Sequence, residues 1–460
     1  MVGHGSTTRR PANRGGTVPQ RDRILALTLM LCLGPYIGAG LRTEQLVVYG
    51  GLPLAMMLGR HPIRDRSFWS PLGCWGAIVA IAVAGYFGPY RPLQPSSDVI
   101  ASIDNLVLPL AVWILASYCL ARDEEQRERQ VVRCCMAWLW VCAIAGVVSI
   151  ASIYLDLSGV LSYFWTGEST SVAILSYGQG RTTGVFNQPA EAGAAFSIAL
   201  LAAWRVSGCP GVRQRLHGVA TALVLIAGIL TVSKVFLLLG LPLWIWRTAR
   251  RSTLPTRRRR QGGNLIVAVG IACIVVAVAF ARSGAATQIG LSLGGFDKGP
   301  VSALSGGRLG GGGSLGSVQT LVLHKSPIFG FGLGGVDMAY DSSHIEILAN
   351  AGMIGVVLYV ALLLGLRRTG STLPRSPDRI LAQSLLLVAV FGGVGLPILT
   401  ANRVGVAWWV LIGACTMGRS RQPMGDVPAA RPAARGATPD RTIWTTSGGT
   451  KSPTSIRFPA

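Results

Sequence analysis

Charged residues are scarce in this sequence, and acidic residues are the scarcest of them. Of the 460 residues only 13% are charged, with 19 Asp and Glu against 42 Lys and Arg, while half are hydrophobic. A chain so poor in charge, with apolar runs that recur along its length, does not describe a set of soluble domains. The composition predicts an all-α polytopic membrane protein in which the apolar runs cross the bilayer as helices.

Cysteine is missing from the segments that we expect on the external side of the membrane. The nine cysteines fall in apolar runs or, for Cys209, in a basic loop, so the sequence predicts no disulfide bond. No spacing of cysteine and histidine resembles a zinc site, and the sequence contains no P-loop and no paired-carboxylate motif. We therefore expect no bound metal ion and no cofactor.

The shortage of acidic residues leaves a net charge of +23, and the basic residues alternate with the apolar runs. Nucleic-acid binding requires one basic patch, whereas an excess in every second loop is the positive-inside bias of membrane proteins. We therefore expect no nucleic-acid partner, and a multi-pass membrane protein with both termini cytoplasmic. The cytoplasmic segments hold 33 of the 42 Lys and Arg and are residues 1–23, 60–66, 122–133, 205–215, 247–260, 367–379 and those after 418.

The hydropathy pattern predicts about twelve transmembrane helices within residues 23–418. Residues 1–22 and 419–460 cannot bury a core and are predicted to be disordered cytoplasmic tails. The mixed-charge segment 122–133 predicts a small surface helix. The predicted spans lie near 24–41, 45–59, 68–88, 105–121, 134–155, 189–204, 218–232, 235–249, 264–281, 345–366, 380–400 and 404–418.

Two predicted external loops are longer than a connection requires. Loop 156–188 contains the aromatic cluster Tyr163, Phe164 and Trp165, which suits a membrane interface. Loop 282–343, between the ninth and tenth spans, contains glycine-rich runs, and a loop of this length is usually functional or disordered. Its GFGLGG run is similar to a nucleotide-binding fingerprint, but no strand–helix unit surrounds it, so we reject that interpretation.

His344 lies where the second external loop meets an apolar helix. Ser343 and Glu346 have the spacing of a capping box, which places His344 in the first helical turn. The positive end of the helix macrodipole disfavours an imidazolium there and leaves a neutral ring that accepts a proton. The alternative is an interfacial histidine without a chemical role.

Two cations next to predicted spans have possible roles in binding an anion. Arg181 enters the sixth span, where its guanidinium offers a bidentate fork to a phosphate; the alternative is an interfacial arginine that snorkels to water. Lys234 separates two spans with almost no loop, so its charge must line a wet cavity or reach the surface.

These segments together resemble the O-antigen ligase and polymerase family. RTTGVFNQP from Arg181 resembles the family's Arg-x-x-Gly-hydrophobic-Phe-x-x-Pro stretch, and Ser233-Lys234 stands where the family has Ser-Arg. SPIFGFGLGG and DSSHIEILANAGMIGVVLY resemble its Pro-x-x-Gly-x-Gly segment and its histidine-bearing helix. The resemblance covers roughly residues 160–370. The lysine at 234 and Gln188-Pro189-Ala190, in place of Asn-Pro-Asn, are departures from the pattern.

The resemblance implies a fold similar to class C glycosyltransferases and a metal-independent glycosyltransferase. Its donor would be a polyprenyl-diphosphate-linked saccharide, and its acceptor a saccharide or glycolipid at the external face of the cytoplasmic (inner) membrane. Arg181, Arg308 and Lys234 would stabilise the diphosphate leaving group, with Arg181 and Arg308 as the catalytic cations. His344 would be the general base, and Glu346 would be no more than part of the helix cap.

Two other functions remain open from the sequence. A polysaccharide or lipid-linked oligosaccharide transporter would also have about twelve spans, although its repeats should show paired broken helices in two halves, and none is visible. A peptidoglycan-type polymerase of related architecture is the other alternative. Transfer from a lipid-linked oligosaccharide without nucleotide or metal would distinguish an enzyme from a transporter.

Overall fold

A computed structural model describes most of the apolar part of the chain. The chain divides into two units, Met1–Ser420 and Arg421–Ala460, and the described residues all belong to the first. Residues 1–20 of the first predicted tail, the second predicted tail 419–460, the predicted span 264–281 and part of loop 282–343 lie outside them, whereas residues 21 and 22 belong to the first helix. The described residues are 21–37, 41–58, 62–63, 65–88, 99–165, 172–179, 181–209, 212–252, 313–335, 341–373 and 376–418.

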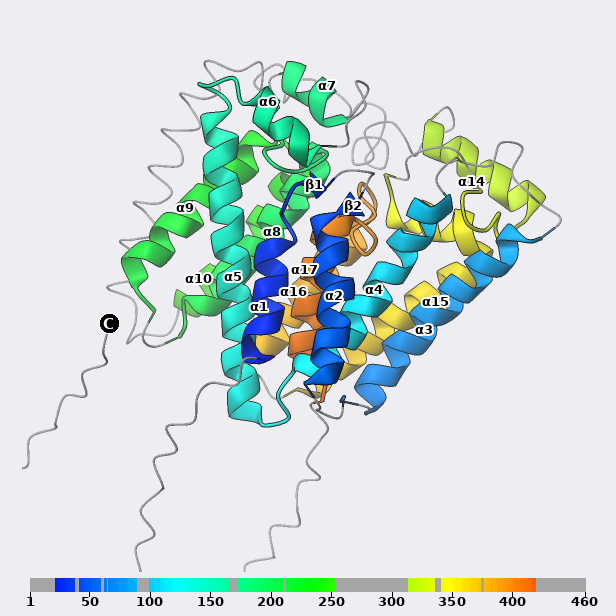
Figure 1. The fold of residues 1–460 in the computed structure, drawn as a ribbon, viewed down its shortest axis with the longest axis horizontal. Helices are drawn as coiled ribbons and strands as arrows, with labels where there is room; N and C mark the ends of the chain where they lie inside the picture. Colours follow the sequence, from blue (N-terminus) through cyan, green and yellow to red (C-terminus); the bar gives the residue numbers. More distant parts are fainter. Residues whose placement is uncertain are drawn as a thin grey trace, which may run out of the picture. The chain divides into compact units, whose positions relative to one another are not determined.

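Helices make up most of the described chain (Figure 1), so the prediction of a helical protein is confirmed. The early elements are α1 (Arg21–Leu31), β1 (Tyr36–Ile37), β2 (Leu41–Arg42), α2 (Thr43–Met57), α3 (Arg66–Tyr86), α4 (Val99–Cys119), α5 (Glu124–Ala151), α6 (Ser158–Leu161), η1 (Ser162–Phe164) and α7 (Val172–Gly178). The later ones are α8 (Pro189–Val206), α9 (Gln214–Leu230), η2 (Phe236–Gly240), α10 (Leu241–Ser252), α14 (Ser314–Lys325), α15 (Ser343–Thr372), α16 (Pro377–Gly392) and α17 (Asn402–Thr416).

Four of the described helices, α3, α4, α5 and α15, are long and apolar enough to cross a membrane. Helix α9 and residues 403–416 of α17 are apolar but shorter. The chain is therefore built as a membrane-embedded helical protein, and the number of twelve spans stays a prediction. The eight cysteines among the described residues are free.

Helix α8 is the centre of the bundle. All its residues from Glu191 to Val206 are buried, because α5, α9, α16 and η2 pack against it. A helix that is apolar on every side has to be covered on every side. Its many alanines let these neighbours approach closely. On the other side of the bundle, α15 packs along α3, and α17 packs against α4.

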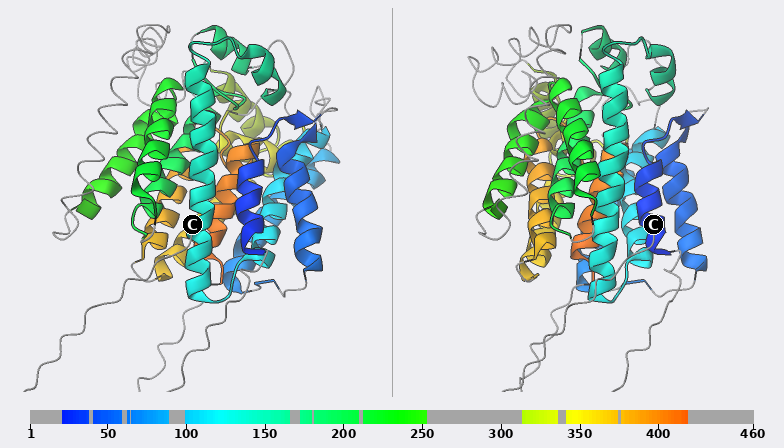
Figure 2. Two further views of the ribbon diagram at one scale, coloured as in Figure 1. Left: turned by 60° about the vertical axis from the view of Figure 1, so that its left-hand side comes forward. Right: turned by 90° about the vertical axis from the view of Figure 1, so that its left-hand side faces the viewer.

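Helix α5 is longer than the predicted span 134–155 and runs through most of the height of the bundle in both views of Figure 2. It begins at Glu124, where the carboxylate of Asp123 accepts a hydrogen bond of 3.0 Å from the Gln126 N–H. The mixed-charge segment 122–133 is therefore the start of α5. The prediction of a separate surface helix there is wrong, because the capping aspartate starts a helix that continues into the apolar run.

The first predicted span, 24–41, is also wrong at its end. Helix α1 stops at Leu31, and the chain turns into the antiparallel hairpin β1–β2 before α2 begins. Pro35 accounts for the stop, since a proline lacks an N–H and excludes the helical conformation from the residue before it. The hairpin places Tyr36 and Arg42 opposite each other.

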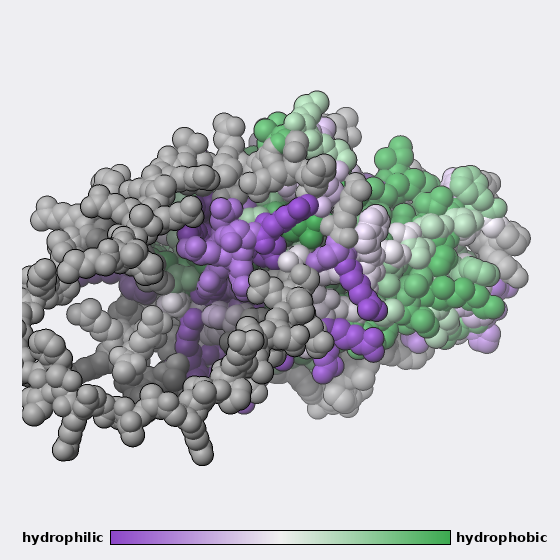
Figure 3. Space-filling model, turned by 90° about the horizontal axis from the view of Figure 1, so that it is seen from below, coloured by the Kyte–Doolittle hydropathy of each residue, from purple (hydrophilic) through white to green (hydrophobic). Residues whose placement is uncertain are grey.

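Several basic segments meet at one end of the bundle. The buried Arg205 of α8 donates from Nε to Asp378 of α16 at 2.5 Å and from Nη2 to Glu128 of α5 at 2.9 Å. Arg251 of α10 donates to the Trp204 carbonyl at 2.7 Å. Figure 3, which views the molecule from below, shows hydrophilic surface beside a hydrophobic flank. The loop helices α6, α7 and α14 lie at the opposite end, at the top of Figure 1.

Candidate active site

Residues 181–189 connect the loop region to α8 and carry Arg181 at their start. Gly184 has a φ of +56°, and a Cβ there would lie 2.2 Å from Oγ of Ser149 on α5, so a side chain does not fit. The Gly184 carbonyl accepts a hydrogen bond of 3.0 Å from Nε1 of Trp165. The segment is thus clamped against α5. Trp165 is buried within the protein, whereas Tyr163 is exposed, and the placement of the aromatic cluster at the membrane interface stays a prediction.

The half-buried Arg181 reaches the C-terminal end of α9. Its Nη2 lies 3.5 Å from the carbonyl oxygens of both Thr231 and Val232. These carbonyls form the negative end of the helix macrodipole and so attract a guanidinium. Because 3.5 Å is long for a hydrogen bond, phosphate oxygens, which bind a guanidinium at shorter distance, compete well with these contacts.

The turn that Arg181 contacts is strained. Val232 has a φ of +50°, a left-handed conformation that a β-branched residue adopts only at a steric cost. Ser233 follows and is buried against Gly193 of α8, where a Cβ would lie 2.2 Å from the Ser233 Oγ. The half-buried Lys234 then begins the helix that continues through η2 into α10. The strained turn therefore brings a lysine and the positive end of a helix close to Arg181.

The start of α15 is anchored to the end of α16. Gly393 offers one carbonyl oxygen to two donors, the Ser343 N–H at 2.8 Å and the Ser342 hydroxyl at 3.0 Å. His344 is the second residue of α15, so its predicted place in the first helical turn is confirmed.

The ring of His344 is held on two sides. Its Nε2 lies 3.3 Å from the carbonyl oxygen of Val390 on α16. Because a carbonyl only accepts hydrogen bonds, Nε2 is the donor, and in a neutral ring Nδ1 is then the atom with the free lone pair. The ring also meets the edge of the Tyr359 ring, with 5.7 Å between the two centroids.

The predicted capping box at Ser343 and Glu346 is wrong. The N-cap residue is Ser342, and its side chain makes no capping hydrogen bond. The Ser343 hydroxyl donates instead to the Leu396 carbonyl at 3.2 Å, and the buried Glu346 carboxylate accepts from the Thr400 hydroxyl at 2.5 Å. Both side chains thus bind the connection between α16 and α17, which competes with the local cap.

Two glycines at the end of α16 allow the turn before Lys234 and the start of α15, which carries His344, to approach the same part of α16. Gly393 binds the start of α15, and a Cβ at Gly392 would lie 3.2 Å from Cγ1 of Val235, the residue after Lys234. Because neither glycine has a side chain, the helices that carry Lys234 and His344 reach the same point of α16.

Three of the four predicted chemical residues are therefore gathered in one region: Arg181, Lys234 and His344. Arg308 lies outside the described residues. Within the described ranges, no group of three or more His, Cys, Asp or Glu residues is arranged to hold a metal ion.

The glycine-rich run of the second long loop fits against α3. Gly332 has a φ of +75°, and a Cβ there would lie 2.2 Å from the backbone nitrogen of Tyr86. The Leu333 N–H donates to the Ala82 carbonyl at 3.0 Å. Close approach to α3 thus accounts for the glycine at 332.

The same run interrupts α15 at Gly352, which has φ +62° and ψ −158°. The N–H groups of Met353 and Ile354 donate to the carbonyls of Pro327 and Ile328, at 2.8 and 3.3 Å, instead of to the preceding helical turn. The predicted span 345–366 lies within α15, but the break at Gly352 inside it was not predicted. A short helical piece carries His344, and a long apolar piece follows it.

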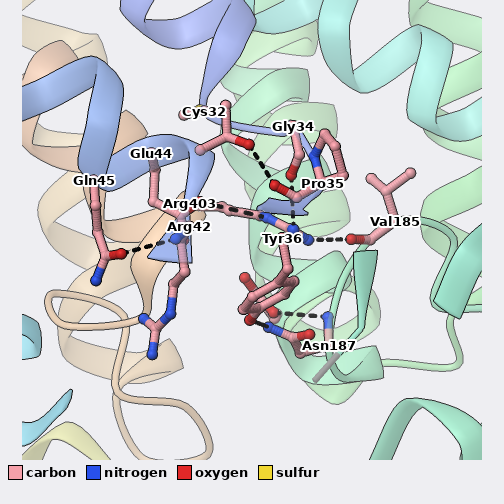
Figure 4. A network of polar contacts seen from close by, with 12 residues as sticks. Cys32, Gly34, Pro35, Tyr36, Arg42, Glu44, Gln45, Val185, Asn187 and Arg403 are labelled. Carbon is pink, nitrogen blue, oxygen red and sulfur yellow. Dashed lines mark hydrogen bonds and ion pairs between the residues drawn. The ribbon is translucent and has the colours of Figure 1, made fainter. Parts of the chain in front are cut away.

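Sequence reasoning missed a buried group of charges beside the site (Figure 4). Arg403 of α17, Glu44 of α2 and Glu191 of α8 are each at least 96% buried at the ends of three helices. Arg403 donates to the carbonyls of Val185 and Gly34, the latter at 2.9 Å. A signal was present, since each of the three charges lies within three residues of the end of a predicted span, where burial is expensive without a partner.

Comparison with models of known protein families gave no match, and comparison with curated proteins gave no significant match.

Proposed function

We propose that the protein is a membrane glycosyltransferase of the O-antigen ligase or polymerase type. It transfers or polymerises saccharides from a polyprenyl-diphosphate-linked donor onto a saccharide or glycolipid acceptor, at the external face of the cytoplasmic membrane. The observation that supports this proposal is the placement of Arg181, Lys234 and His344 near the adjoining ends of α9, η2, α15 and α16. Two cations and one imidazole are the groups that such a transfer requires.

The cations stabilise the diphosphate leaving group. As the glycosidic bond to the donor diphosphate breaks, negative charge develops on the phosphate oxygens, and fixed positive charges stabilise it. Arg181 provides a guanidinium beside the strained turn, and Lys234 provides an ammonium at the positive end of a helix. Arg308 is a third cation of this site in the proposal.

His344 acts as the general base for the acceptor hydroxyl. The acceptor hydroxyl gives its proton to Nδ1, while its oxygen forms a bond to the anomeric carbon of the donor saccharide. The bond between that carbon and the diphosphate oxygen breaks, and polyprenyl diphosphate leaves with both electrons of the bond. The contact between Nε2 and the Val390 carbonyl fixes the tautomer that this step needs.

The proposal is tested with purified protein in lipid nanodiscs, a labelled polyprenyl-diphosphate oligosaccharide and an acceptor glycan, with chelator and without nucleotide. We expect a longer or ligated glycan and free polyprenyl diphosphate in equal amounts. A transporter would leave the donor chemically intact, and that result would overturn the proposal.

His344→Ala is the variant that tests the general base. We expect transfer to fall by about 10²–10⁴-fold, since general-base catalysis typically contributes this much. The variant should still insert, because with the described residues the ring makes only one hydrogen bond and one aromatic contact. His324→Ala, which truncates an exposed histidine of α14, is the matched control. Near-normal turnover in His344→Ala would remove the histidine from the reaction.

A further inference from the structure

The far end of segment 181–189 carries a second polar group, built on Asn187, Glu191 and Tyr36. The Asn187 N–H donates to Oε2 of Glu191 at 3.0 Å, and its Nδ2 donates to the Tyr36 hydroxyl at 2.8 Å. Asn187 and Tyr36 are half-buried, so both border solvent-accessible space, whereas Glu191 is 96% buried behind them. Oε1 of Glu191 accepts no hydrogen bond from any described residue.

Two buried charged residues, Arg403 and Glu44, lie close to Tyr36 (Figure 4). The guanidinium of Arg403 lies 5.4 Å from the centroid of the Tyr36 ring. Its Nε is 4.0 Å from Oε2 of Glu44, beyond hydrogen-bond distance, and neither atom bonds to another described residue. The region thus presents carboxylate acceptors and a guanidinium donor whose hydrogen bonds are not complete.

The charges restrict the class of ligand that fits here. Two buried carboxylates, Glu44 and Glu191, interact electrostatically with the guanidinium groups of Arg403 and Arg42. These four charges balance, so no net charge is left to compensate the burial of a further anion or cation. A neutral molecule with many hydroxyl groups has no such penalty, since each hydroxyl both donates and accepts. An aromatic ring beside carboxylate and amide groups also suits a saccharide, whose faces are apolar and whose edges are polar.

We propose that Tyr36, Asn187 and Glu191 form a binding site for a neutral saccharide. This proposal rests on the proposed function, in which the saccharide is the acceptor. In that reaction the Tyr36 ring packs on a sugar face, and Asn187 binds a hydroxyl at the rim. Glu191, buried behind them, positions Asn187 by accepting the hydrogen bond from its backbone N–H.

One segment holds the two sites in a fixed relation. Arg181 at its start binds the donor diphosphate, and Asn187 near its end binds the acceptor. Between them, the Trp165 indole holds the Gly184 carbonyl, and Arg403 donates to the Val185 carbonyl. A rigid segment between donor and acceptor sites supplies the orientation that a two-substrate transfer needs.

The test measures binding alone, so that it does not depend on turnover. Full-length protein in nanodiscs is titrated with free glucose, galactose, mannose, rhamnose and N-acetylglucosamine, and binding is followed by saturation-transfer NMR. We expect at least one of these sugars to bind. Glu191→Gln should weaken that binding about 10-fold and Asn187→Ala about 3- to 10-fold, as one lost hydrogen bond predicts.

The matched control is Asn105→Ala, which truncates an amide that accepts from Arg42 at the edge of the same region. It should bind the sugar as the wild type does. Absence of binding for every sugar, or equal binding in all four proteins, would overturn the site and leave water as the partner of Glu191. Asn187→Ala covers the case in which Glu191→Gln does not fold.

Inorganic pyrophosphate, titrated in the same samples, separates this site from the proposed function. Its binding should weaken in Lys234→Met and not in Asn187→Ala. If Lys234→Met leaves pyrophosphate affinity unchanged while Asn187→Ala weakens sugar binding, the proposed donor site is wrong and the saccharide site is supported. The reverse result removes the saccharide site and leaves the donor site in place.

Discussion

The two described cations of the candidate site differ in how the protein holds them. Arg181 has a planar fork and lies against the carbonyls that end α9. Lys234 has a point charge at the start of a helix, next to a backbone conformation that valine adopts only under strain. A fork binds two phosphate oxygens at once, whereas an ammonium attracts them without fixed geometry. Exchanging the two side chain types should therefore have opposite effects.

We expect Arg181→Lys to lower transfer severely, because the variant keeps the charge and loses the fork. Lys234→Arg should be tolerated or improve turnover, and Lys234→Met should raise the donor KM. The measurement is the dependence of transfer on donor concentration for these three variants. If Lys234 only reaches towards the membrane surface, Met and Arg will both leave the donor KM unchanged.

At the scale of elements, the glycines of the loop before α15 and Gly352 inside α15 together allow the loop to pair with the helix. The break at Gly352 lets the loop carbonyls of Pro327 and Ile328 replace those of the preceding helical turn. The short piece that carries His344 can then differ in direction from the apolar piece that follows. Helix interruptions of this kind are tolerated in membrane proteins where other protein groups satisfy the backbone.

Gly352→Ala should therefore destabilise the protein by about 1–3 kcal/mol or more, the cost of a strained backbone conformation, and should lower transfer. A Cβ at this position would also lie 2.3 Å from the Ile328 carbonyl oxygen. The matched control is Gly76→Ala in α3, where a Cβ meets nothing within 4 Å. Thermal unfolding in nanodiscs is the measurement. Equal unfolding temperatures for the two variants would contradict the role of the break.

The element scale also shows what local sequence patterns can and cannot predict. Apolar runs long enough to cross a bilayer predicted α3, α4, α5 and α15, because length and hydropathy are properties of the segment itself. The ends of elements were less predictable. The cap expected at Ser343 and Glu346 does not form, because both side chains bind Leu396 and Thr400, which are distant in the sequence. Such tertiary competition has no local signature.

Among the site residues, His344 could be predicted because it follows a short polar segment and precedes an apolar run. Arg403 and Glu191 could not be assigned a role, since a charge at the end of a span reads equally as an interfacial anchor. Only the fold shows that Arg403 reaches the carbonyls of Val185 and Gly34. Burial is thus the information that the sequence did not contain.

At the scale of the whole bundle, two groups of ion pairs and hydrogen bonds tie the helices together at separate ends. One group is Arg205 with Asp378 and Glu128, which joins α8, α16 and α5. The other is Arg403 with its carbonyl partners, beside Glu44. Reporter fusions test which end faces the cytoplasm. We expect a fusion after Ser252 to report a cytoplasmic position and one after Lys325 an external position. An external signal after Ser252 would overturn the predicted orientation.

The buried pair of Arg205 and Asp378 should contribute more to the stability of the bundle than an exposed ion pair does. Both side chains are at least 97% buried, so Arg205→Ala removes the guanidinium from a buried carboxylate and should lower the free energy of unfolding by about 3–5 kcal/mol. The control is Arg129→Ala, which removes a pair within α5 whose side chains are 60% and 76% exposed. An exposed pair at this helical spacing is worth only about 0.5 kcal/mol. Both variants are measured by chemical unfolding in nanodiscs, and an effect of Arg205→Ala as small as that of Arg129→Ala would show that water reaches Asp378.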